Sequence, residues 1–500
     1  MTTSFPPINY PSKPVPPFTA EPPRNQFPGF YPDMLKNIKG KPYITVSSKG
    51  LANGQSEYFN DGADFGPDSL QADGSLTQTL GLQEAADYIT KNNSTIKVLD
   101  GTYSISKTVT FPSLDYINFK GNGRSTVIIP NTSMTSVLDI SNIGEQCVFS
   151  DLTISSGINS DDSGGLSTYC IYGESTTSNN GFQTLFRNVN FWTYKTYPIY
   201  ISSTANCFGG MVLDNVSDNL LPSGYYSTLG VYINISSGNV VRIINSHFSG
   251  IVNISTSELE IVNSLFWGII LNIGEGTGSI VSSSIYGSQN YNVDSAGNPA
   301  NVQLSGRLSL VGCYLPNNGY LVSTTEEDIF YLSDPTNGVG YVSLLNCFIS
   351  ISNFHTTNLI NGDTTTAYSV YMEKCIIDAA DSTLTCNILS SSSLSNNMGM
   401  KDIIYSRTSS VTFDDYPSQP TTPSVPSSGT AQENTNPYAV DVYVYGGDVT
   451  EIQITRNGTA YTVLSVSTAI AMSGQSYSLN PGDSITVTYS TAPSWEWLSD

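Results

Sequence analysis

Basic residues are scarce in this sequence. Its 500 residues include 19 Lys and Arg against 41 Asp and Glu, so the formal net charge is −22. Charged residues of either sign make up only 12% of the chain. Binding to nucleic acid or to an anionic membrane through a basic patch is therefore not expected. A neutral or cationic partner fits the composition better.

Residues that commonly hold metal ions are also few. The chain has two histidines and seven cysteines, and the cysteine spacing does not match a zinc site. The acidic residues do not form an aligned set of calcium ligands. We therefore expect no metal site and no cofactor.

Long apolar runs are missing as well. No segment is long and apolar enough to span a membrane, and the first residues have neither a basic start nor an apolar run. We expect no membrane insertion and no signal peptide.

A short phrase recurs along the chain. Residues 241–250 read VRIINSHFSG, 259–268 read LEIVNSLFWG and 279–287 read SIVSSSIYG. We take Asn245 as the reference residue of this phrase, and the matching positions elsewhere are Tyr116, Asp151, Asn188, Asn215, Asn263, Ser282, Gly312, Asn346 and Lys374. The residue two before each of these positions is large and apolar. The residue three after is also apolar, with Asp218 as the exception.

This spacing requires a corner at the reference residue. Strand side chains alternate between faces, so positions five apart point to opposite sides unless the chain turns between them. Asn, Ser and Gly suit the backbone of a tight corner. A recurring strand, corner and second strand predict the coils of a parallel β-helix.

The residue that follows each corner also predicts stacking. It changes along the chain from aliphatic to serine and then to Cys313, Cys347 and Cys375, so like residues are expected on successive coils. Coils about 4.8 Å apart hold these cysteines beyond the reach of a disulfide. We therefore predict a buried ladder of thiols.

Composition divides the chain into four segments. Residues 1–45 are rich in Pro and aromatic residues, which predicts an anchoring arm or a flexible tail. Residues 46–405 are expected to form the β-helix, with a cap over 57–105 that contains an amphipathic helix and coils over 106–405. Residues 406–436 have the composition of a linker. Alternating apolar residues then predict a small antiparallel β-sandwich over 437–500.

Four motifs near the N-terminus carry a resemblance to a known family. They begin at Asp64 (DFG), Leu82 (LQEAA), Asp100 (DGTY) and Phe119 (FKGNGR). In this order they resemble the opening of pectate-lyase-like right-handed parallel β-helix proteins, which include many phage tailspikes. The motifs match over residues 57–130. The resemblance implies a right-handed, all-β fold and, through the tailspikes, a homotrimer.

The resemblance also implies where an active site is to be sought. Enzymes of this family that cleave polysaccharides use paired carboxylates or a calcium-assisted base along one face of the coils. The candidates here are Asp161 and Asp162, in an insertion after the second coil, with Glu174 nearby in sequence. A polar loop without a catalytic role explains the same residues. The Gly-His and Arg-x-Lys motifs of pectin hydrolases are missing, so the catalytic set stays open.

Three aromatic residues are candidates for glycan binding. Trp192, Trp267 and Tyr286 stand four residues after a corner, where alternation points them outward. Sugar rings stack their apolar faces on such side chains while Asn, Ser and Thr bond the hydroxyl groups. Alternatively, these aromatic residues form a packed surface ladder or part of a subunit interface.

These observations lead to one hypothesis and two alternatives. Parallel β-helices of polar composition usually work outside cells, so a chain without an export signal favours a virus particle, which is assembled inside its host. The leading hypothesis is a tailspike-like virion surface protein that attaches to host glycans, forms a homo-oligomer and binds other virion proteins through its N-terminal arm. The first alternative is a secreted or virion-borne polysaccharide lyase or glycoside hydrolase. The second is an extracellular adhesion or surface-layer protein at a cell surface.

Overall fold

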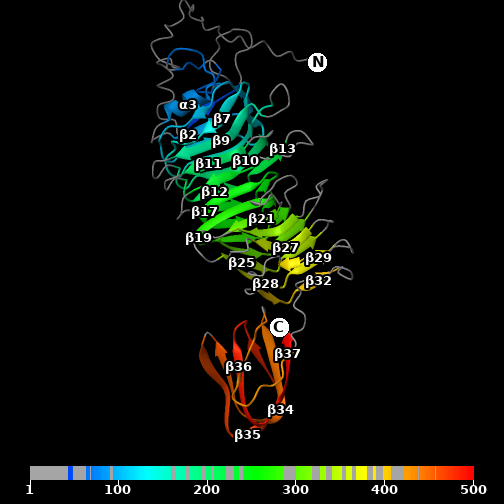
Figure 1. Ribbon diagram of the computed structural model, residues 1–500. Coiled ribbons are helices and arrows are strands. Elements are labelled where there is room, and N and C mark those ends of the chain that lie inside the picture. The colour runs from blue at the N-terminus through cyan, green and yellow to red at the C-terminus, as the bar shows by residue number, and fades with distance from the viewer. Residues whose placement is uncertain are drawn as a thin grey trace, which may run out of the picture.

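A long parallel sheet wound into coils forms most of this protein, and a separate antiparallel sheet follows near the C-terminus (Figure 1). The parallel strands are joined by crossover connections and form a right-handed parallel β-helix, which confirms the predicted fold class. The computed structural model describes residues 43–48, 63–67, 69–71, 73–89, 94–158, 165–175, 181–193, 197–203, 208–220, 230–235, 240–286, 300–317, 327–333, 340–351, 356–362, 368–379, 387–389, 398–406, 422–436, 439–456 and 458–499.

Three parallel ladders run along the β-helix. Face 1 precedes each corner and comprises β1 (Ile44–Val46), β2 (Thr95–Val98), β5 (Asn118–Lys120), β8 (Val148–Ser155), β10 (Leu185–Thr193), β12 (Met211–Asp214), β15 (Val240–Ile244), the second parts of β17 (Val252–Val262) and β19 (Ile269–Val281), β22 (Arg307–Val311), β25 (Gly340–Leu345), β28 (Tyr368–Glu373) and β31 (Met398–Lys401). Face 2 follows each corner and comprises β3 (Gly101–Ile105), β6 (Thr126–Pro130), the second parts of β8 and β10, β13 (Ser217–Leu220), β16 (His247–Phe248), β18 (Leu265–Trp267), β20 (Ser284–Tyr286), β23 (Tyr314–Asn317), β26 (Phe348–Ile351), β29 (Ile376–Ala379) and β32 (Ile404–Ser406). Face 3 comprises β4 (Val109–Thr110), β7 (Met134–Asp139), β9 (Ser167–Ser175), β11 (Tyr197–Ser203), β14 (Tyr232–Asn234), the first parts of β17 and β19, β21 (Ala300–Ser305), β24 (Glu327–Leu332), β27 (Thr356–Gly362) and β30 (Asn387–Leu389).

The corners lie where the sequence predicts them. Every predicted reference residue has a positive φ, from 49° at Ser282 to 62° at Tyr116 and Gly312, and Asp402 adds a corner that was not predicted. Asparagine also links neighbouring coils, because Asn263 Nδ2 donates to Asn245 Oδ1 at 2.8 Å. The corner asparagines therefore supply both the left-handed backbone and a ladder of side-chain amides.

Replacing Asn263 by alanine is expected to lower the free energy of unfolding by about 1–2 kcal/mol, because alanine is strained at φ 50° and ends the amide ladder. Glycine at the same position keeps the backbone conformation and loses only the ladder, so its effect should be smaller. Urea unfolding of both variants measures the difference. An alanine variant as stable as the original protein would contradict this role of the corner.

The interior of the β-helix is filled by the predicted apolar columns. Phe248 and Phe266 are fully buried on successive coils, and their rings stack with centroids 6.1 Å apart. The residues after the corners are buried as well, and Cys313, Cys347 and Cys375 are unpaired thiols at most 1% exposed. This confirms the thiol ladder.

Asp218 occupies an apolar column although it carries a carboxyl group. It lies in register with Phe191 and is fully buried. Its Oδ1 accepts hydrogen bonds from the backbone N–H of Ser249 at 2.5 Å and from the Ser249 hydroxyl at 2.6 Å, whereas its Oδ2 has no partner among the described residues. Burial raises the pKa of this carboxyl group.

The predicted cap helix is present as α3 (Leu82–Tyr88). Leu82, Ala85 and Ala86 on its inner side are fully buried, and Glu84 accepts a hydrogen bond from Thr77 Oγ1 at 2.8 Å. The helix therefore covers apolar residues at the start of the coils. Within the described residues, no helix has the length and apolar character needed to cross a membrane.

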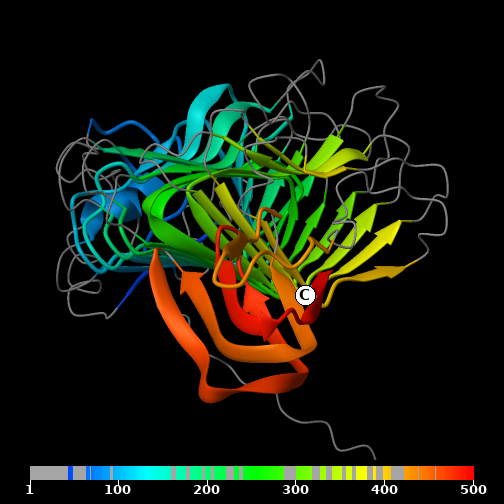
Figure 2. The ribbon, with the colours of Figure 1, turned by 60° about the horizontal axis from the view of Figure 1, so that its bottom comes forward.

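The C-terminal sheet consists of β33 (Ala431–Glu433), β34 (Val440–Arg456), β35 (Thr459–Leu479), β36 (Ser484–Thr491) and β37 (Ser494–Ser499). All its pairings are antiparallel, and the two longest strands, β34 and β35, curve through several register shifts (Figure 2). Val425 packs on its core and Trp495 Nε1 donates to the carbonyl of Pro423. Within the segment expected as a linker, residues 431–433 therefore form a strand of this sheet, and residues 422–430 before it include contacts with the sheet. Residues 1–42 of the expected arm lie outside the described residues.

Candidate functional site

Two of the three predicted aromatic residues lie together on face 2. Trp267 and Tyr286 are in register on neighbouring coils, and their rings stack with centroids 5.0 Å apart at an interplanar angle of 21°. Tyr314 meets the edge of Tyr286 at 6.2 Å, and Phe348 lies 5.5 Å from Tyr314. We call these four residues the face 2 aromatic patch.

Trp192 does not join this patch. It is in register with Asn219, and the pairings of β13 with β16 and of β16 with β18 place Trp267 three coils from it. At about 4.8 Å per coil this is roughly 14 Å, too far for ring contact. Trp192 is partly exposed, so it remains a separate aromatic position on the same face.

Only one of the three candidate carboxylates can be placed. Asp161 and Asp162 lie outside the described residues. Glu174 is exposed at the end of β9 on face 3, where it accepts a hydrogen bond from the Tyr172 hydroxyl and its own N–H donates to Ser141 Oγ at 3.0 Å. The described part of the chain contains no group of three or more His, Cys, Asp or Glu that could hold a metal ion.

A second aromatic array, on face 3, was not predicted. Tyr172, Tyr200 and Tyr232 are in register on successive coils. Their rings stack with centroids 5.8 Å and 4.8 Å apart and interplanar angles of 7° and 13°. Tyr169 and Tyr197 flank the stack, with Tyr169 only 4.7 Å from Tyr200. We call these five residues the tyrosine ladder.

The sequence does contain a signal for the ladder. Residues 169–172 read YCIY and 197–200 read YPIY, which is the same spacing of two tyrosines around an isoleucine. The phrase that defines the corners does not extend to this repeat, because loops of different length separate face 2 from face 3. Alignment on the corners therefore does not bring these tyrosines into one column.

Stacking decides which parts of the tyrosines a ligand can reach. Nearly parallel rings with centroids about 5 Å apart overlap face to face, so ring faces inside the stack are covered by their neighbours. Ring edges and hydroxyl groups remain at the surface. Burial, followed by the hydrogen bond to Glu174, raises the pKa of Tyr172, and burial also raises the pKa of Tyr200. Both hydroxyls therefore stay protonated at neutral pH, and the proton of Tyr172 is donated to Glu174.

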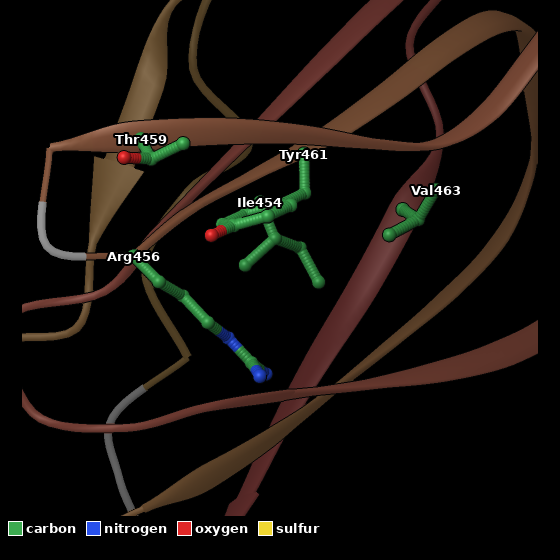
Figure 3. Close-up of a pocket in the computed structure, with 5 residues that line it drawn as sticks. All are labelled: Ile454, Arg456, Thr459, Tyr461 and Val463. Atoms are coloured by element: carbon green, nitrogen blue, oxygen red, sulfur yellow. The ribbon is translucent and has the colours of Figure 1, made fainter.

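The C-terminal sheet has a shallow hollow with a volume of about 440 Å³. Figure 3 shows Arg456 extending beneath Ile454 and Tyr461. Arg456 Nε lies 3.3 Å from Asp483 Oδ2, and its Nη2 donates to the carbonyl of Ser478 at 2.9 Å. Its charge is therefore balanced within the sheet, so the hollow lacks an unpaired cation for an anionic ligand. The residues that line it are Ile454, Arg456, Thr459, Tyr461 and Val463.

Comparison with known proteins shows likeness in architecture only. No protein-family model and no curated protein matches the sequence. Among solved structures, the A-module of a mannuronan C-5 epimerase from Azotobacter vinelandii is 11% identical with a TM-score of 0.35, and the match covers 66% of this chain and 94% of that one. PfbA, a surface adhesin of Streptococcus pneumoniae, is 12% identical with a TM-score of 0.34 over 76% of this chain and 95% of its own. The enzymatically active domain of tailspike protein 4 of bacteriophage CBA120 is 12% identical with a TM-score of 0.36 over 94% of this chain and 79% of its own.

Proposed function

We propose that this protein binds glycans along the outside of its β-helix. The observation that carries the proposal is the presence of two aromatic arrays, the face 2 aromatic patch and the tyrosine ladder, on the outer faces of the coils. Their rings are partly exposed and have hydroxyl and amide groups beside them. This combination of apolar rings and uncharged polar groups suits sugars, which have apolar ring faces and hydroxyl edges.

The biological setting that we propose is a virion surface, where the protein attaches the particle to host glycans in the manner of a tailspike. The resemblance of the N-terminal motifs to the pectate-lyase-like and tailspike proteins supports this setting. Stiff parallel coils suit an exposed shaft, because only their two ends leave unpaired strand edges. The anchoring arm of this proposal, residues 1–45, falls almost entirely outside the described residues, and its binding to other virion proteins is part of the proposal.

A pull-down with neutral and acidic polysaccharides tests glycan binding, and mass spectrometry of the same samples follows polymer length. We expect bound, intact chains, and about a tenfold weaker affinity when Trp267 and Tyr286 are both replaced by alanine, since stacking contributes about 1–2 kcal/mol. Tyr341→Ala is the matched control, because Tyr341 is 38% exposed on face 1. Shortened chains would instead support the lyase or hydrolase alternative, and no binding to any polymer would overturn the proposal.

We also propose that copies of the chain associate through β35, with a trimer as the expected state. This strand pairs with β34 alone among the described strands and contains no Lys, Arg, Asp or Glu. It exposes Tyr461 by 53%, Val463 by 46% and Ile470 by 41%. A long, uncharged edge strand with exposed apolar side chains is a template for pairing, and its neutrality avoids repulsion between copies of an acidic chain.

Val463→Lys is expected to shift the protein from oligomer to monomer, because the new charge would have to be buried in the contact. Sedimentation velocity measures the change. Ser427→Lys adds the same charge at an exposed position of the C-terminal region outside β35 and should leave the oligomer intact. A monomeric unmodified protein would overturn the proposal.

A further inference from the structure

The tyrosine ladder ends at Tyr232, and this end differs from the rest of the stack. One face of the Tyr232 ring is covered by Tyr200, with centroids 4.8 Å apart. On the opposite side the next residue in register is Asn253, followed by Ile270 and Gln303 on the next two coils. These side chains have no aromatic ring to stack on Tyr232. No tyrosine of this column therefore covers the second face of Tyr232, and at the other end of the stack the residue in register with Tyr172 is the carboxylate Asp139.

Uncharged polar side chains form the next outward column of face 3. Register pairs Ser202 with Asn234, Asn234 with Ser255, and Ser255 with Asn272. Asn234 Nδ2 lies 3.4 Å from the Tyr232 hydroxyl, so the amide and the ring belong to one surface. Amides and hydroxyls both donate and accept hydrogen bonds, as the hydroxyl groups of a sugar do.

The charge on face 3 restricts the kind of sugar. The described strands of this face contain no Lys or Arg, and Asp139 and Glu174 stand at the start of the two columns. A uronic acid, sialic acid or phosphorylated sugar would therefore meet carboxylates without a cation to balance its charge. With a net charge of −22, the whole chain also repels an anionic polymer at a distance.

We propose that the surface formed by Tyr232, Asn234, Asn253 and Ser255 binds a neutral sugar. One pyranose ring stacks on the uncovered face of Tyr232, and its hydroxyl groups bond to the two amides and to the serine hydroxyl. Further units of the polymer extend along the axis over Ile270 and Asn272. This inference rests on the proposed glycan binding and adds to it the position of a subsite and the class of ligand.

The test measures, by affinity electrophoresis, how strongly the full chain binds two kinds of polymer. The neutral polymers are dextran and mannan, and the anionic polymers are polygalacturonate and alginate. We expect retardation by at least one neutral polymer and none by the anionic ones. Tyr232→Ala should weaken that retardation about tenfold, which corresponds to about 1.4 kcal/mol. Asn253→Ala should weaken it as well. Tyr341→Ala is the control on face 1, and circular dichroism of every variant checks the fold.

Each other outcome is decisive. If a neutral polymer binds and Tyr232→Ala and Asn253→Ala bind it as well as the original protein does, the subsite is wrong while glycan binding stands. Retardation by the anionic polymers alone overturns the inference in the same way. If no polymer is bound, the proposed function and the inference fail together. A Tyr232→Phe variant that keeps full binding would support stacking over hydrogen bonding by the phenol.

Discussion

Replacing Phe266 by alanine is expected to lower the free energy of unfolding by about 3–5 kcal/mol. Phe266 is fully buried, stacks on Phe248 and is in register with Ile285 on the next coil. Its loss removes apolar burial and leaves a cavity between two coils that are fixed by backbone pairing. Because backbone pairing keeps the coils from moving together to fill the cavity, relaxation restores little of the lost free energy of unfolding. Urea unfolding followed by circular dichroism measures the loss.

The adjacent residue provides the control for this prediction. Leu265 belongs to the same strand, β18, but it points to the opposite side and is only partly buried. Leu265→Ala should therefore cost clearly less, about 1 kcal/mol. Equal losses for the two variants would contradict the assignment of the inner and outer sides of face 2.

Replacing Asp218 by asparagine is expected to remove a pH dependence of stability. Burial raises the pKa of Asp218 above its ordinary value of 3.8, so the folded state holds this proton more tightly than the unfolded chain does. The stabilising contribution of the protonated group is complete below the unfolded pKa and is lost as pH rises through the folded pKa. The melting temperature of the original protein should therefore fall over that range, and that of the asparagine variant should fall less.

The control must separate Asp218 from the general repulsion among acidic residues. Asp214 lies in the same coil, where its Oδ2 is 3.0 Å from Arg187 Nε at the surface. Asp214→Asn removes the same formal charge and should keep the fall in melting temperature with pH. Thermal unfolding from pH 3 to pH 8 compares the variants. Parallel curves for the original protein and Asp218→Asn would show that Asp218 does not titrate as an unpaired buried group.

Local sequence was sufficient to predict the coils because the corner imposes a local requirement. Only some residues accept the left-handed backbone, and the flanking positions must be apolar to fill the interior, so each coil repeats the same short pattern. Even Tyr116 and Lys374, which are unusual corner residues, were located by their apolar flanks and have φ values of 62° and 52°. Asp402, which was not predicted, has the same kind of flanks, since Met400 stands two residues before it and Tyr405 three residues after.

The two binding arrays show what the pattern could not supply. Trp267 and Tyr286 belong to the repeated phrase, so their positions after the corner predicted that they would be neighbours, and their rings are 5.0 Å apart. The ordered corners also placed Trp192 apart from them, because the corners at Asn215 and Asn245 come between the coil of Trp192 and the coil of Trp267. The carboxyl group of Asp218 appeared only as an exception to the apolar column, and the structure shows that it is buried there, with no partner for Oδ2 among the residues that the structure describes.

The sequence by itself therefore determined the coil, its corners and the residues that fill its interior, because these depend on contacts within a few residues and on alternation along a strand. The tertiary structure decided the tyrosine ladder and its uncovered end at Tyr232. Tyr172, Tyr200 and Tyr232 are separated in sequence by loops of irregular length, and only the winding of the coils brings them into register. A surface made of one residue from each coil depends on the register between coils. That register is set by the length and conformation of the loops between them, which the pattern within one coil does not contain.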